Sequence, residues 1–252
     1  MNDADNPVLH AIESRQSIRA FRQTPVAPEL LQRILHAASY APSGSNIQPW
    51  KVHVLTGSAR DQLSTALLKA FDESEPERRE YQYYPVEWRS PYLERRRETG
   101  WGLYRTLGIA KGDREASKRQ HRRNFEFFGA PVVLLFTIDS DMGTGSWLDY
   151  GMFLQSVMVA ARGLGLHTCP QAALANYPDI VKRQLGIPDN QTVVCGMGLG
   201  YANEDDVVNT FRPARMALDE FVTFHGDPSR PETMRDEAAE AAPSQAQEPR
   251  DA

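Results

Sequence analysis

The sequence predicts an α+β fold with three layers, in which helices flank a central mixed or antiparallel sheet. Segments with the apolar spacing of helices alternate along the chain with short segments typical of strands. One of these, 132–138, is an uninterrupted run of β-branched, leucine and aromatic residues, as expected for a strand buried on both faces. A long apolar helix with few charges is predicted over 147–162. Together these features favour a sheet enclosed by helices on both sides.

The composition limits the classes of function. A chain of 252 residues with 41% hydrophobic residues can bury a full core, and we expect one domain over 7–225. A net charge of -5 argues against nucleic-acid binding. No apolar run approaches the roughly 20 residues needed to cross a bilayer, and the polar N-terminus has no features of a secretory signal. We therefore expect a cytoplasmic protein without a membrane partner. Cys169 and Cys195 lack metal-ligand spacing, so we expect no metal site.

Start and stop signals set the expected helices and strands. Asn6 as N-cap and Pro7 at the first helical position predict a helix over 7–14. A second helix is expected from Thr24 to Tyr40, ended by Ala41-Pro42 because proline disfavours helix in the residue before it. Strands are further predicted at 51–55 and 191–201, and helices at 58–71 and 178–185.

The stretch Ser14-Arg15-Gln16-Ser17-Ile18-Arg19 follows the first helix. If it is extended, Arg15, Ser17 and Arg19 point one way while Gln16 and Ile18 point the other. Two guanidiniums and a hydroxyl between them suit the oxygens of a phosphate monoester, and we call Arg15, Ser17 and Arg19 the arginine cradle. An alternative is that both arginines are solvated or complement the C-terminal dipole of the preceding helix.

A loop rich in Pro, Ser, Gly and Asn follows the second helix, over 41–50. Its composition suits a backbone that turns closely around a ligand. The patterns Ser-Arg-x-Ser-Ile-Arg-x-Phe and Ala-Pro-Ser-x-x-Asn-x-Gln-Pro-Trp together resemble the start of the FMN-dependent nitroreductase family. The resemblance extends along most of the chain. The segments Tyr-Tyr-Pro, Tyr-Leu-Glu-Arg-Arg-Arg and Gly-Ser-Trp-Leu-Asp-Tyr-Gly look most like the branch that reduces nitroaromatics such as nitrobenzoates.

The resemblance implies a set of cofactor contacts. The loop supplies Ser43, Asn46 and Gln48, and the segment at 167–173 matches the family segment whose backbone passes the reactive edge of the flavin. The motif Asn209-x-Phe211-Arg212-x-x-Arg215 matches one that places a basic residue on the FMN phosphate. With the cradle included, the expected FMN-binding residues are Arg15, Gln16, Ser17, Arg19, Ser43, Asn46, Gln48, Pro170, Gln171, Ala172, and Arg212 or Arg215.

Glycines alternate at positions 196, 198 and 200 of the last predicted strand. They do not form a dinucleotide-binding fingerprint, because the run ends in a polar loop rather than opening a helix. Alternate glycines in a strand instead allow the close approach of another backbone or of a ring.

The region 72–124 is rich in tyrosine, tryptophan and arginine. In the family, the corresponding insertion covers the flavin and sets substrate choice, and Arg96 is then a candidate to pair with a substrate carboxylate. Alternatively, these residues pack on the body of the protein or across a dimer interface. From Gly226 onward polar and acidic residues dominate, and we expect a disordered tail over 226–252.

The resemblance implies a homodimer with FMN at each interface. NADPH or NADH would reduce the flavin and leave, and a nitroaromatic would then be reduced to the hydroxylamine in a ping-pong cycle. Rival hypotheses are a flavin-dependent reductive dehalogenase of the same superfamily and a flavin-binding protein without catalysis. A further alternative is nucleophilic catalysis by Cys169 with His167.

Overall fold

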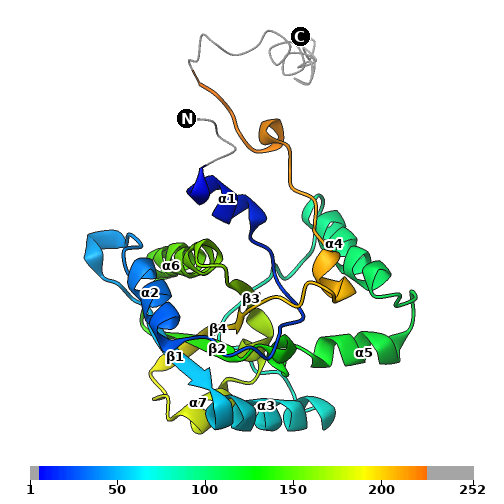
Figure 1. The fold of residues 1–252 in the computed structure, drawn as a ribbon, viewed down its shortest axis with the longest axis horizontal. Coiled ribbons are helices and arrows are strands. Elements are labelled where there is room, and N and C mark those ends of the chain that lie inside the picture. Colours follow the sequence, from blue (N-terminus) through cyan, green and yellow to red (C-terminus); the bar gives the residue numbers. More distant parts are fainter. Residues whose placement is uncertain (1–5, 226–252) are drawn as a thin grey trace, which may run out of the picture. The chain divides into compact units, whose positions relative to one another are not determined.

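Four antiparallel strands form the central sheet within residues 6–225, the part of the chain that this computed structural model describes. The strands are β1 (Lys51–Thr56), β2 (Val132–Asp139), β3 (His167–Gln171) and β4 (Gln191–Gly200). Their order is β1-β2-β4-β3, and each neighbouring pair is antiparallel (Figure 1). The predicted α+β class is confirmed, and of the two expected sheet types the antiparallel one is present.

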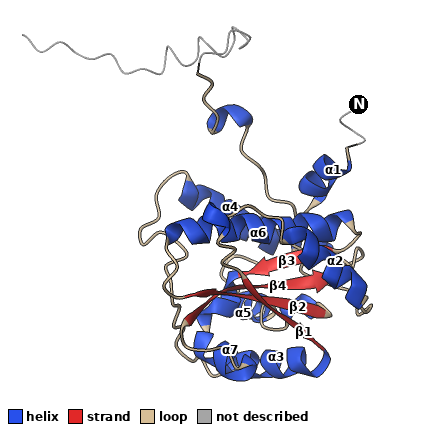
Figure 2. Cartoon of the chain, turned by 90° about the vertical axis from the view of Figure 1, so that its left-hand side faces the viewer, coloured by secondary structure: helices blue, strands red, loops and turns tan. Residues whose placement is uncertain are grey.

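Each face of the sheet carries its own hydrophobic core. In β2, Val133 and Leu135 pack with α3 (Gly57–Asp72) and α7 (Pro178–Leu185), whereas Leu134 and Phe136 pack in the other core. That second core contains residues of α2 (Pro28–Ala38) and α6 (Thr144–Gly163). Figure 2 shows the two pairs of helices on opposite sides of the strands. The uninterrupted apolar run of β2 is therefore explained, because its alternating side chains enter two cores.

The first two helices begin at prolines. In α1 (Pro7–Ser14), the side chain of Asn6 accepts two backbone N–H groups at 3.0 and 3.3 Å, as predicted. α2 begins at Pro28 rather than at Thr24, so the predicted start was too early. Ala27 is extended because the proline that follows it disfavours helical backbone there.

The glycines of β4 allow other parts of the chain to approach closely. A Cβ at Gly196 would lie 2.0 Å from the side chain of Leu174, and one at Gly198 would lie 3.2 Å from the carbonyl oxygen of Phe127. The prediction that these glycines allow close packing is confirmed.

Residues 72–124 contain two helices, α4 (Tyr92–Thr106) and α5 (Arg114–Arg122). The guanidinium of Arg122 forms two hydrogen bonds of 2.9 Å to the carboxylate of Asp72, and this pairing holds the pKa of the carboxyl below its usual range. On α4, Gly102 faces the ring of Phe211. Both helices are therefore tied to residues outside themselves.

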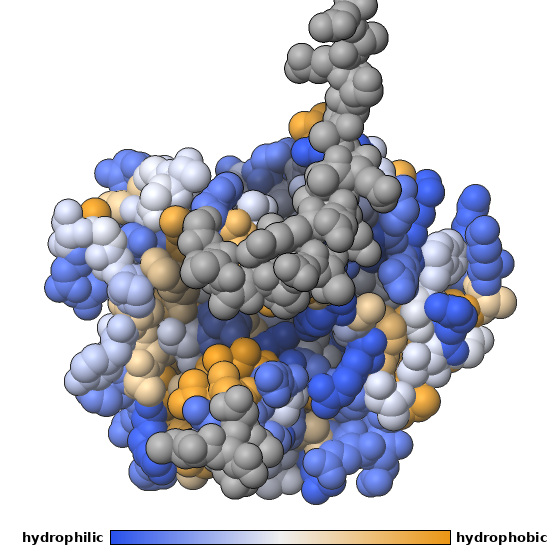
Figure 3. All heavy atoms as spheres, turned by 90° about the horizontal axis from the view of Figure 1, so that it is seen from above, coloured by the Kyte–Doolittle hydropathy of each residue, from blue (hydrophilic) through white to orange (hydrophobic). Residues whose placement is uncertain are grey.

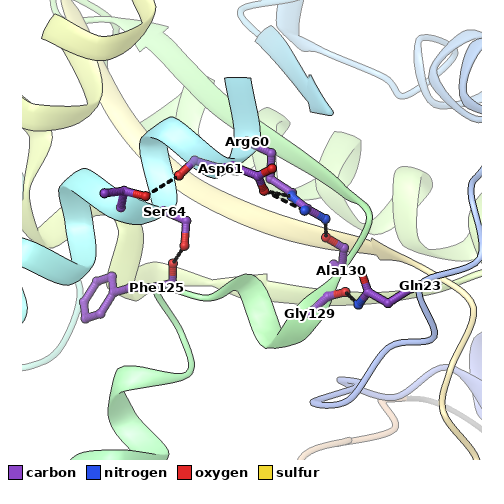
Figure 4. Close-up of polar contacts among 8 residues, drawn as sticks. Gln23, Arg60, Asp61, Ser64, Phe125, Gly129 and Ala130 are labelled. Atoms are coloured by element: carbon purple, nitrogen blue, oxygen red, sulfur yellow. Dashed lines mark hydrogen bonds and ion pairs between the residues drawn. The ribbon is translucent and has the colours of Figure 1, made fainter. Parts of the chain in front are cut away.

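The segment that leads into β2 is fixed by side-chain donors from two other parts of the chain (Figure 4). Three side chains donate hydrogen bonds to backbone carbonyls of this segment. Ser64 donates to Phe125 at 2.8 Å, Arg60 to Ala130 at 3.0 Å, and Gln23 to Gly129 at 2.9 Å. These bonds satisfy polar groups beside the apolar core and fix where β2 begins.

The chain divides into two units, Met1–Pro213 and Ala214–Ala252. Of the second unit the structure describes residues 214–225, which include a 3-10 helix at Leu218–Glu220. The tail predicted over 226–252 lies outside the described residues. No helix between residues 6 and 225 is both long enough and apolar enough to cross a bilayer.

Candidate active site

The segment after α1 is extended and runs along the outer edge of the sheet. Ser17 forms a parallel bridge with Thr168 of β3, and the backbone N–H of Ile18 donates to the Thr168 carbonyl at 3.0 Å. The Ile18 side chain is buried in the core, whereas Arg15, Ser17 and Arg19 are half-buried. This is the alternation that the sequence predicted for an extended chain.

Arg15, Ser17 and Arg19 converge on the thiol of Cys169. Burial raises the pKa of this thiol to about 11, and the charges of Arg19 and Arg15 and a hydrogen bond with Ser17 oppose that rise. Two guanidiniums and a hydroxyl on one side of β3 favour an anion there. The thiol stays protonated at neutral pH, which argues against Cys169 and His167 as a nucleophilic pair.

Asn209 holds this cradle from the far end of the first unit. Its Oδ1 accepts the backbone N–H of Arg19 at 2.8 Å, and its backbone carbonyl accepts Nε2 of Gln16 at 3.0 Å. The Oε1 atom of Gln16 is buried and has no hydrogen-bond partner among the described residues. Arg212 follows Asn209 closely in sequence and is exposed, whereas Arg215 belongs to the second unit.

A cavity of about 470 Å³ adjoins β3. Pro170 and Ala172 line it, together with side chains of α6 and of the segment 81–83. Its full lining is Tyr81, Gln82, Tyr83, Thr144, Trp147, Tyr150, Gly151, Leu154, Pro170, Ala172, Val194 and Cys195. Gln171 is not in this lining: it is buried, and its Nε2 donates to the Asn124 carbonyl at 2.7 Å. The lining is mostly apolar and includes four aromatic rings, so the cavity suits a planar apolar group.

A bulge in β4 anchors one wall of the cavity. The register of β4 against β2 shifts at Val194, and the hydroxyl of Tyr81 donates to the Val194 carbonyl at 2.5 Å. Next to it, the carboxylate of Glu80 accepts the backbone N–H of Val193 at 2.8 Å and pairs with Lys182. The Tyr81 ring also lies 4.6 Å from the ring of Trp147. These contacts fix the segment that begins the aromatic region.

The loop with Ser43, Asn46 and Gln48 is anchored elsewhere. The backbone N–H of Gly44 donates to Asp149 of α6 at 3.0 Å, and that of Gln48 donates to Oγ of Ser43 at 3.0 Å. Asn46 and Gln48 are exposed, and both have positive φ angles of 57° and 50°. Such backbone is uncommon outside glycine and is concentrated at functional sites. In the described residues, the hydrogen bonds of this loop do not reach the cradle or the cavity.

A model of the nitroreductase family matches residues 12–201, which include the cradle, the loop and β3. The chain belongs to the nitroreductase family.

Relatives of this nitroreductase-family chain match over most of its length. The 4-nitrobenzoate reductase of Pseudomonas putida is 42% identical over 215 residues, which cover 85% of this chain and 94% of the relative. The FMN and NADPH-dependent nitroreductase NfnB from Sphigopyxis sp. strain HMH is 37% identical, with a TM-score of 0.84 and coverage of 87% and 99%. NfnB from Mycobacterium smegmatis, solved in complex with NADPH, is 33% identical with a TM-score of 0.84 and coverage of 88% and 100%.

Several residues that build this nitroreductase site escape a local sequence pattern. Glu80, Tyr81 and Trp147 reach it from distant parts of the chain. Asn209 belongs to the motif at 209–215, but its contact with Arg19 was not predicted by that motif. Only the aromatic enrichment of 72–124 signals that part of this region has a binding role. No group of three or more His, Cys, Asp or Glu side chains that could hold a metal ion occurs within residues 6–225.

Proposed function

We propose that this nitroreductase-family protein is an FMN-dependent NAD(P)H oxidoreductase that reduces nitroaromatic compounds. The observation that carries the proposal is the arrangement along β3. Its Cys169 lies beside two arginines and a serine hydroxyl, while Pro170 lines an apolar cavity walled by aromatic rings. A dianionic phosphate and a planar ring system joined by a short chain match these two adjacent environments. The relatives named above support the assignment, because one is named a 4-nitrobenzoate reductase and the two NfnB proteins are named FMN-dependent nitroreductases, one of them NADPH-dependent and the other solved with NADPH.

The residues present fit FMN. Arg15, Ser17 and Arg19 would hold the phosphate, with Arg212 as a further cation of the same unit. The buried Oε1 of Gln16 and Oγ1 of Thr168 lack protein partners among the described residues, and they supply polar contacts beside the cradle. Pro170, Ala172 and the backbone at Gln171 would border the ring.

The chemistry comes from the cofactor, while the chain binds and orients the reactants. FMN held there would supply two-electron chemistry with NAD(P)H as the hydride source: two electrons and two protons convert the nitro group to the nitroso group with loss of water, and a second pair of each gives the hydroxylamine. We infer a ping-pong order, because the nicotinamide and the nitroaromatic both require the planar space beside Pro170 and Ala172 and must use it in turn.

We further propose that the active protein is a homodimer. On α6, Leu148 is 70% exposed, and on α1, Val8 is 58% exposed, so apolar side chains of two helices face outward in the single chain. Figure 3 shows hydrophobic side chains among hydrophilic ones on the face that carries α1. A second copy would cover such surfaces and bring its own Ser43, Asn46 and Gln48 to the flavin. Light scattering should give twice the chain mass, and Leu148→Glu should lower both that mass and the FMN content.

The first experiment is the visible spectrum of the purified protein. We expect a flavin band that bleaches on anaerobic addition of NADPH and returns on addition of a nitroaromatic. Iodotyrosine, supplied in place of the nitro compound, tests the dehalogenase alternative. A flavin that NADPH cannot reduce would instead indicate a binding protein, and failure to take up FMN would overturn the assignment.

The phosphate assignment has a test of its own. Wild-type apoprotein should bind FMN more tightly than riboflavin, which has the same ring but no phosphate. In Arg19→Ala, the ratio of the riboflavin Kd to the FMN Kd should fall about tenfold or more. An equal loss of affinity for both flavins would show that Arg19 supports the fold rather than the phosphate.

A further inference from the structure

The cavity beside Pro170 has no charged side chain in its lining, as far as residues 6–225 extend. Its polar groups are hydroxyls, an amide and a thiol. Burial raises the pKa of the Cys195 thiol to about 12, so this group also stays neutral. An anionic substituent placed inside would lose its hydration without gaining a counter-charge, which is costly. Any carboxylate on a bound nitroaromatic must therefore remain at the rim.

A cation, Arg79, lies beside the part of this lining that Tyr81, Gln82 and Tyr83 form. A second cavity of about 340 Å³ shares Tyr81, Gln82 and Tyr83 with the first, and Arg79 also lines it. We call this second cavity the rim cavity. Burial raises the pKa of Tyr83, and the nearby guanidinium of Arg79 opposes that rise. Arg79 is exposed and makes no ion pair or side-chain hydrogen bond within the described part of the chain.

The acidic neighbour of Arg79 is already engaged. The carboxylate of Glu80 lines the same rim cavity, but it pairs with Lys182 and accepts the N–H of Val193 at 2.8 Å. These bonds hold the segment 79–83 against β4, so the base of Arg79 is fixed although its side chain is exposed. The guanidinium is thus available to an external anion.

Two other arginines of the aromatic region lie over aromatic rings. The guanidinium of Arg96 lies 4.5 Å from the ring centre of Trp88, and that of Arg89 lies 5.1 Å from the ring centre of Tyr92. Neither residue lines the cavity beside Pro170 or the rim cavity. The sequence hypothesis that Arg96 pairs with a substrate carboxylate therefore has no support from its position.

We propose that Arg79 is a specificity-determining residue, which pairs with an anionic substituent of the nitroaromatic while the nitro group points inward. The inference rests on the function proposed above. A nitro group and a carboxylate at opposite ends of one ring match an apolar cavity with a cation at its rim. The substrate class is then the carboxylated nitroarenes, with 4-nitrobenzoate as the probe.

The experiment compares 4-nitrobenzoate with its methyl ester, which has a similar shape but no charge. In Arg79→Gln, the ratio of kcat/KM for the acid to that for the ester should fall about two- to fivefold, the size expected of an exposed ion pair. The loss should lie in KM for the acid, because the pairing is made equally in ground and transition states. Arg79→Lys should restore part of the ratio. Benzoate and methyl benzoate, titrated against the oxidised flavin spectrum, give the same comparison without turnover.

Arg96→Gln and Arg89→Gln are matched controls, and both should leave the acid-to-ester ratio unchanged. An unchanged ratio in Arg79→Gln would overturn the proposal, as would a fall of the same size in Arg96→Gln. If the wild-type protein reduced neither compound, the proposed function would fail, while the benzoate titration would still decide the role of Arg79.

Discussion

The backbone N–H of Arg19 donates to Oδ1 of Asn209 at 2.8 Å, across 190 residues of sequence. The amide nitrogen of Asn209 in turn donates to the carbonyls of Ala20 and Asn203, each at 2.8 Å. Because Asn209 is buried, water does not satisfy these polar groups, and the hydrogen bonds among them do so instead. One side chain thus fixes the backbone from which the arginine cradle projects.

Asn209→Ala should therefore impair both folding and cofactor binding. Loss of the side chain leaves the backbone N–H of Arg19 without its partner and removes one hydrogen bond to each of the carbonyls of Ala20 and Asn203. We expect a loss of about 1–3 kcal/mol in the free energy of unfolding. The Kd for FMN should rise because Arg19 is no longer held. Asn203→Ala is the control, since the bonds of Asn203 here come from its backbone. Equal urea midpoints for the two variants would contradict the prediction.

Two glycines of α4 should respond in opposite ways to alanine. A Cβ at Gly100 meets nothing within 4 Å, so Gly100→Ala should stabilise the helix by about 0.5–1 kcal/mol. A Cβ at Gly102 would lie 2.6 Å from Cε2 of Phe211, and that ring would have to move. Gly102→Ala should be at least about 1 kcal/mol less stable than Gly100→Ala. Thermal unfolding of both variants checks this, and equal stabilisation would show that α4 and Phe211 are not in contact.

Glu80→Ala should loosen the wall of the cavity beside Pro170. It removes the acceptor of the Val193 N–H and leaves the largely buried Lys182 ammonium without its partner. We expect a loss of about 1–3 kcal/mol in stability and a higher KM for nitroaromatics. Glu87→Ala, at an exposed position of the same region, should change the free energy of unfolding by less than about 0.5 kcal/mol. An unchanged KM in Glu80→Ala would mean that Tyr81 is held by its own bond to Val194.

His167 should make folding stability depend on pH. Burial lowers its pKa, the charge of Arg162 lowers it further, and Glu204 opposes the shift. Its Nδ1 accepts the backbone N–H of Ala202 at 3.4 Å, which requires the neutral ring. In the unfolded chain the imidazole takes up a proton below its ordinary pKa of 6.5, whereas the folded chain does so only at lower pH. Stability is therefore full above about pH 6.5 and falls as pH drops towards the folded pKa.

His167→Gln should flatten that dependence. Urea unfolding above and below pH 6.5 should give a smaller difference for the variant than for the wild type. Some slope should remain, because burial also lowers the pKa of His53. A variant with the same slope as the wild type would show that His167 does not carry the effect.

Local patterns predicted the parts of the fold that local physics decides. The Asn6 cap and Pro7 set the start of α1, and the unbroken apolar run of 132–138 set a strand buried on both faces. The start of α2 was wrong because Pro28 restricts Ala27 more strongly than Thr24 favours a cap. The extended alternation at 15–19 was predicted because it depends on a period of two residues alone.

The sequence by itself determined the family, the α+β class, and the chemistry of the cradle, because each depends on residue types at short spacing. Tertiary structure decided which distant residues meet. It placed Asn209 under Arg19, clamped Glu80 to the bulge of β4, and set Arg79 rather than Arg96 at the rim of the cavity. Such contacts join residues far apart in the chain, and packing and hydrogen-bond satisfaction across the whole core select them. No local period or motif carries that information.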